Sequence, residues 1–151
     1  MEIVPNEWLP EYLLPNAGKR ERSIADRFVD GWDNAVYKVV LRYKSPLILK
    51  FLRYWQQSKT VLESAARFKR VHLLIRDSGK TILVDESDVK QFPQEIQTRS
   101  HSKDKYLVEL AYSGADRTIV TTDRDLKESL SKVCGVSVCL LEEFLRQHCN
   151  N

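Results

Sequence analysis

Short apolar runs alternate along the chain with longer stretches in which apolar residues recur every three or four positions. The runs are rich in β-branched residues, as buried strands are, and span residues 1–4, 37–41, 81–84, 118–121 and 136–139. The longer stretches have the spacing of one apolar helix face and span residues 7–14, 23–32, 45–57, 59–76, 103–112, 124–132 and 141–148. Strands that alternate with helices predict an α/β fold: a mostly parallel central sheet of four to five strands flanked by helices.

Several helix ends carry recognisable signals. Ser45 followed by Pro46 predicts a helix start, because Ser is a favoured N-cap and Pro is tolerated at the first helical position. Ser23 predicts the start of the 23–32 helix in the same way, and Gly79 marks the end of the 59–76 helix. The stretch from 85 to 98 is irregular, with one helical turn expected near 93–96.

Length and composition describe an ordinary globular protein. The chain has 151 residues, 42% hydrophobic and 30% charged, which fits one domain over residues 1–151. No apolar run approaches the length of a membrane span, and the N-terminus lacks a basic region followed by an apolar one. The three cysteines lack C-x-x-C spacing and there are three histidines, so we expect a cytoplasmic protein without a zinc site.

The net charge of +3 conceals a strongly basic segment, residues 38–80, which we call the basic block. It holds 11 Lys and Arg against 2 Asp and Glu, whereas residues 1–37 and 81–97 each sum to −3. A basic block in a near-neutral protein favours an acidic partner, either nucleic acid or an acidic protein segment. A solvated helix face explains the same block, and the sequence leaves both explanations open.

Carboxylates gather around the fourth predicted strand. Asp104 opens the helix before this strand, and Asp123 and Asp125 follow its end. The carboxyl ends of strands bind ligands in open α/β sheets, and oxygen ligands suit Mg²⁺ and Mn²⁺. These residues therefore predict a divalent-metal site. The structural alternative is that Asp104 complements the dipole of its helix and that Asp123 caps the next one.

The tract at residues 102–126, SKDKYLVELAYSGADRTIVTTDRDL, resembles the C-terminal half of the PIN nuclease domain. The matching positions are Asp104, Ala111, Gly114-Ala115-Asp116, Ile119-Val120-Thr121, Asp123 and Asp125-Leu126. The resemblance implies a PIN-like three-layer fold and an acidic site whose Mg²⁺ or Mn²⁺ activates water for RNA hydrolysis. It also implies RNA as the substrate, and a protein partner (an antitoxin) or a homodimer. It follows the order of elements over nearly the whole chain but is specific only in the last third.

Two of the four acidic positions of the family are changed here. The first strand ends with Asn6 where the family has Asp, and Lys50 falls where the family has Glu; Asp104 and Asp123 keep the other two positions. An ammonium group repels a divalent ion and is expected to pair with Asp104 and Asp123 instead. Asn6 as a helix N-cap and Lys50 as a surface lysine are the structural alternatives.

Two functional hypotheses follow. The first is a PIN-like protein with impaired or lost catalysis that binds nucleic acid or protein. The alternative is an active, toxin-like endoribonuclease that binds Mg²⁺ or Mn²⁺ weakly through Asp104 and Asp123, with Asp125 and Asn6 as further ligands. In either case we expect contacts to RNA phosphates from Arg42, Arg53, Arg67, Lys69 and Arg70. A receiver-like or dinucleotide-binding domain lacks support, because the acidic pair after strand one and the Gly-rich turn are missing.

Overall fold

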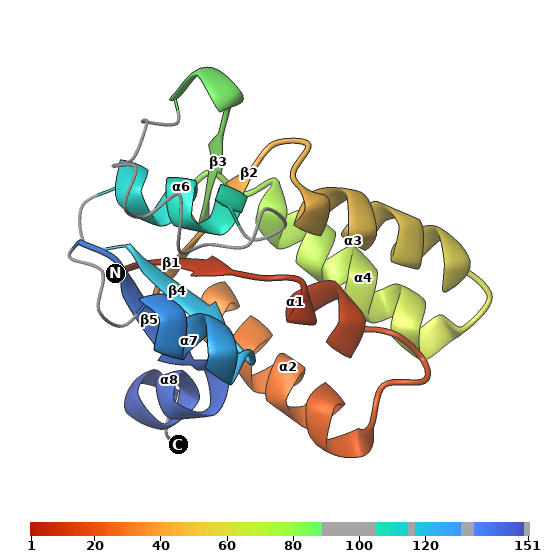
Figure 1. Cartoon of the computed structure of the whole chain (residues 1–151). Helices are drawn as coiled ribbons and strands as arrows, with labels where there is room; N and C mark the ends of the chain where they lie inside the picture. The colour runs from red at the N-terminus through yellow and green to blue at the C-terminus, as the bar shows by residue number, and fades with distance from the viewer. Residues whose placement is uncertain (89–104, 115–116, 131–134, 150–151) are drawn as a thin grey trace.

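A single parallel sheet organises the protein. The structure, a computed structural model, describes residues 1–88, 105–114, 117–130 and 135–149 (Figure 1). Five strands pair in the order β3-β2-β1-β4-β5, and every pairing is parallel. They are β1 (Glu2–Pro5), β2 (Lys38–Arg42), β3 (Thr81–Val84), β4 (Thr118–Thr121) and β5 (Ser137–Leu140). The predicted α/β class with a mostly parallel sheet is confirmed.

Helices cover both faces of the sheet (Figure 1). One face is covered by α1 (Trp8–Tyr12), α2 (Lys19–Asp33), α3 (Pro46–Gln57), α4 (Leu62–Ile75) and α8 (Leu141–His148). The other face is covered by α6 (Lys105–Ser113) and α7 (Arg124–Leu130). A 3-10 helix, η1 (Glu86–Asp88), follows β3. Among the described helices, none has the length and apolar character needed to cross a membrane. The helical turn expected at 93–96 lies outside the described residues.

Alternation along the strands separates two apolar cores. Ile3 is fully buried against the helices of the first face, and its neighbour Val4 is fully buried against α6 and α7. Ile119 and Val120 on β4 divide between the two cores in the same way. The first core is rich in aromatic rings around Phe28, whose ring centre lies 4.9 Å from that of Trp8 in an edge-on arrangement. A sheet buried on both faces explains why its strands appear as continuous apolar runs.

The predicted helix starts are confirmed for α3, for α7 at Arg124 and for α8 at Leu141, and are wrong for the second and fourth helices. Ser45 caps α3, and its Oγ accepts a hydrogen bond from the Ile48 N–H at 3.3 Å. The second helix begins at Lys19 rather than after Ser23, because its first turn is charged and exposed and so carries no apolar signal. The fourth begins at Leu62 rather than 59, because residues 58–61 form the turn that joins α3 to α4.

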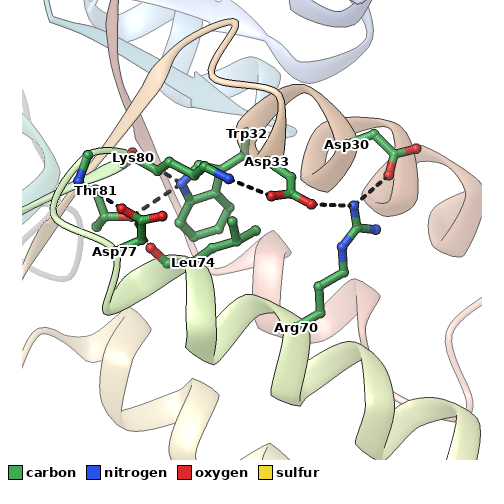
Figure 2. A network of polar contacts seen from close by, with 9 residues as sticks. Asp30, Trp32, Asp33, Arg70, Leu74, Asp77, Lys80 and Thr81 are labelled. Atoms are coloured by element: carbon green, nitrogen blue, oxygen red, sulfur yellow. Dashed lines mark hydrogen bonds and ion pairs between the residues drawn. The ribbon is translucent and has the colours of Figure 1, made fainter.

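A polar network ties α2 and the end of α4 to the start of β3 (Figure 2). The indole N–H of buried Trp32 donates to the Lys80 carbonyl and to the Thr81 hydroxyl, each at 3.2 Å. The Thr81 hydroxyl in turn donates to the Leu74 carbonyl at 2.7 Å. Because the network lies at the amino edge of the sheet, it supports the fold and stands apart from the strand ends where ligands bind.

Candidate functional site

The strand order creates a topological switch point between β1 and β4. From β1 the chain continues to β2 and β3 on one side of the sheet, whereas from β4 it continues to β5 on the other side. The connections therefore diverge at the carboxyl ends of these two strands, which is where open α/β sheets bind ligands. Asn6 follows β1 and Thr121 ends β4, so both lie at this point.

An amide and a hydroxyl join the two strands there. Asn6 Nδ2 donates to Thr121 Oγ1 at 2.8 Å, and Thr121 is completely buried. The Asp123 N–H donates to the same hydroxyl oxygen at 3.0 Å. Asn6 Oδ1 accepts a long hydrogen bond, 3.5 Å, from the Trp8 N–H, so it also supports the start of α1. The Asn6 side chain thus presents an N–H group, rather than an oxygen, to the end of β4.

Asp123 caps α7, as the structural alternative predicted. Its Oδ1 accepts hydrogen bonds from the N–H groups of Asp125 at 2.9 Å and Leu126 at 3.1 Å. Asp125 is exposed in the first turn of the same helix, where the helix dipole favours a carboxylate. Asp104, which precedes the first described residue of α6, lies outside the described residues.

Lys50 pairs with Glu11 of α1 and with Glu7, the N-cap of that helix. The predicted pairing with Asp123 is wrong. The Lys50 ammonium lies 2.9 Å from a carboxylate oxygen of Glu11 and 3.3 Å from one of Glu7. The reason is the packing of α1 against α3, which brings two glutamates one helical turn apart to the lysine. Burial disfavours the charge, but the hydrogen bond and charge of Glu11, together with those of Glu7, outweigh it and raise the pKa of Lys50. The ammonium therefore stays charged beside the switch point.

The acidic side chains that the structure describes do not converge on one point. Within the described parts of the chain, no three His, Cys, Asp or Glu side chains are arranged to hold a metal ion. Glu7 and Glu11 share one ammonium, and Asp123 bonds the start of α7. Of the four predicted positions, the structure brings Asn6 and the residues around Asp123 together at the switch point and turns Lys50 toward α1.

Much of the basic block is neutralised within the protein. Its partners come mainly from the acidic face of α2, where Asp30 and Asp33 bind Arg70 and Lys80 (Figure 2). The acidic partner indicated by the sequence is therefore in part the protein itself. Of the other predicted phosphate contacts, Lys69 is exposed on α4 and the Arg53 guanidinium lies 5.3 Å from the Tyr54 ring centre. The ion pairs are Arg42 with Glu86 and Glu109, Arg67 with Asp26 and Glu63, Arg70 with Asp30 and Asp33, and Lys80 with Asp33.

A cavity of about 340 Å³ opens beside the end of β4. Tyr12 and Thr122 line it. Burial, and then the charges of Glu21 and Glu11, raise the pKa of Tyr12. Arginines from three helices also line it, together with two glutamates and three apolar side chains: Arg20, Arg124, Arg146, Glu142, Glu143, Ile24, Leu140 and Leu141. These arginines gave no signal in the sequence, because acidic residues nearby in the chain cancel their charge in any segment sum.

The arrangement defines a class of protein: a three-layer, Rossmann-like α/β protein with a polar site at the switch point of its sheet. No protein-family model, no curated protein and no solved structure matches the chain. The resemblance of residues 102–126 to PIN nucleases therefore stays a prediction.

Proposed function

We propose that this protein is a cytoplasmic PIN-like module that has lost metal-dependent catalysis and binds single-stranded RNA at the carboxyl edge of its sheet. The observation that carries the proposal is the hydrogen bond from the Asn6 amide to the Thr121 hydroxyl. The Asn6 amide occupies the position at the end of the first strand where a metal nuclease of this type needs a carboxylate. The geometry favours a polar binding surface over a cation site.

Charge supports the loss of catalysis. Mg²⁺ and Mn²⁺ are held by oxygen ligands, and carboxylates supply most of the attraction. Here the first strand ends in a neutral amide, and the second family position is an ammonium that two glutamates keep protonated. Glu7 and Glu11 are bound to this ammonium, so a divalent ion entering this edge would have to displace Lys50 before it could use those carboxylates as ligands.

The position of the site supports binding. The switch point is where this class of sheet receives ligands, and the cavity beside it is lined by arginines. Arginine forms paired hydrogen bonds with phosphate oxygens, and aromatic side chains such as Tyr12 stack on bases. Together these groups suit a phosphate-bearing strand better than an acidic protein segment, which offers no bases to stack.

The second candidate is an active Mg²⁺- or Mn²⁺-dependent endoribonuclease. One observation favours it: α1 brings Glu7 and Glu11 to the same edge as Asp123. If a metal displaced the Lys50 ammonium, these carboxylates would supply charge that the family positions lack.

The two candidates differ in how RNA responds to metal. The test is fluorescence anisotropy with a labelled single-stranded oligouridine of about 12 nucleotides, in EDTA and in Mn²⁺, with the length of the RNA read on a gel. We expect equal binding in both buffers and intact RNA. Failure to bind would contradict the proposal. Mn²⁺-dependent cleavage that Asp123→Asn abolishes would establish the nuclease instead.

A further inference from the structure

Two adjoining cavities form one cleft between α2, α7 and α8. Their volumes are about 340 and 430 Å³, within the range of small-ligand sites. They share four lining residues, Arg20, Ile24, Glu142 and Arg146. We call this feature the arginine cleft, after the four arginines that line it: Arg20, Arg27, Arg124 and Arg146.

The fold gathers these arginines from distant parts of the sequence. Arg20 and Arg27 stand two turns apart on the same face of α2, with Ile24 between them. Arg124 begins α7 and Arg146 lies in the last turn of α8. Helices α2 and α8 pack directly against each other, and α7 reaches the cleft through its contact with β5 (Figure 1). The cleft is thus a product of tertiary packing that no single segment reveals.

The walls of the cleft combine apolar and polar surface. Leu140 and Leu141, where β5 meets α8, are buried residues that contribute apolar surface, and half-buried Tyr12 adds an aromatic ring. Thr122 also lines the cleft and directly follows Thr121 of the switch point. The cleft therefore adjoins the switch point at the end of β4.

Two glutamates in the cleft do not cancel its positive charge. Glu142 pairs with Arg20, but both side chains are largely exposed, 54% and 75%, so the pair is weak and a competing anion can open it. Glu143 is bound to Lys127 at 2.9 Å, and that hydrogen bond lowers the pKa of its carboxyl group. Within the described segments, no carboxylate lies within 4.0 Å of the charged nitrogens of Arg27, Arg124 or Arg146, and the charges of Arg146 and Arg124 act on Glu143 only as smaller contributions to its lowered pKa.

We infer that the arginine cleft holds the phosphate groups of single-stranded RNA, with Tyr12 placed to stack on a base at the end nearest β4. The inference rests on the proposed function and names the surface that performs it. It contrasts with the basic block, where Arg42, Arg67 and Arg70 are already paired with carboxylates. Arginines without such partners give up fewer contacts when they bind phosphate.

The test compares two charge-matched double variants in the oligouridine anisotropy assay over a series of KCl concentrations. Arg124→Glu with Arg146→Glu alters the cleft. Lys59→Glu with Arg76→Glu, which we call the α4 variant, makes the same change in charge at two exposed residues that flank α4. For single strands, each lost phosphate contact lowers the magnitude of the slope of log K against log salt by roughly 0.7. We expect the cleft variant to bind RNA about tenfold more weakly or worse, with the magnitude of its slope reduced by about 1.4. We expect the α4 variant to keep the wild-type slope.

Three outcomes would overturn the inference, and they are distinguishable. Equal weakening by both variants would indicate general electrostatic attraction rather than a site. If the wild type binds RNA and only the α4 variant binds it more weakly, the binding site lies in the basic block, and the proposed function stands. Absence of wild-type binding would overturn the proposed function as well. Circular dichroism checks the fold of each variant, and Arg124→Gln with Arg146→Gln replaces the cleft variant if the charge reversal prevents folding.

Discussion

Deleting one hydroxyl group tests the polar junction between β1 and β4. Thr121→Val keeps the shape of the completely buried side chain but removes the oxygen that accepts from Asn6 Nδ2 at 2.8 Å and from the Asp123 N–H at 3.0 Å. Each such bond contributes about 1 kcal/mol net, so we expect a loss of about 2 kcal/mol in the free energy of unfolding.

Urea denaturation followed by circular dichroism measures this loss. With a slope of about 2 kcal/mol per molar, the midpoint should fall by about 1 M, and in a thermal scan Tm should fall by about 4–8 °C. Thr118→Val is the matched control: Thr118 is half-buried at the opposite end of the same strand, and its side chain makes no hydrogen bond among the described residues. We expect it to change stability by less than about 0.5 kcal/mol.

A double-mutant cycle assigns the effect to the pair. Combining Thr121→Val with Asn6→Ala should show a coupling energy of about 1 kcal/mol, because the first change already removes the bond that the second would break. The reasoning is refuted if Thr121→Val is no more destabilising than Thr118→Val, or if the coupling is zero. Either result would mean that the amide and the hydroxyl do not hold the strand ends together.

Three further changes probe other parts of the account. Asp123→Ala removes the cap from α7 and should cost about 1 kcal/mol in urea denaturation, whereas Asp123→Asn should restore most of it. Thr81→Val leaves the Leu74 carbonyl without its hydroxyl partner and should cost roughly 1–2 kcal/mol in the same assay; an unchanged midpoint would show that solvent replaces the bond. Burial, and then the charge of Arg76, lower the pKa of His72 below its ordinary 6.5, so the unfolded state binds this proton more tightly. Stability should therefore fall as pH drops from about 7.5 to 5.5, and His72→Gln should flatten that dependence; an equal slope in the variant would contradict the assignment.

The sequence predicted the strands well because each is short, apolar and rich in β-branched residues. The predicted ranges 81–84 and 118–121 coincide with β3 and β4, and each of the other three strands lies one residue further along the chain than predicted. A shift of this size is expected for β5, since Val136 just before it is as buried as a strand residue. Helix starts were harder, because a charged first turn such as that of α2 gives no periodic signal.

The contacts of the site were not predictable in the same way. Asn6 and Thr121 are separated by 115 positions, and only the pairing of β1 with β4 brings them together. The resemblance directed attention to the ends of these strands, but the partners of Lys50 depend on how α1 packs against α3. The arginine cleft has no linear signature at all, because its four arginines come from three helices.

Calorimetric titration with Mn²⁺ tests the central claim, that an amide and an ammonium have replaced the carboxylates of a metal site. The wild type is compared with the double variant Asn6→Asp and Lys50→Glu, and oligouridine cleavage is followed in the same buffers. We predict no measurable Mn²⁺ binding and no cleavage by the wild type, and a gain of Mn²⁺ binding in the variant. Mn²⁺ binding and RNA cleavage by the wild type, both lost in Asp123→Asn, would contradict the account and identify a working nuclease.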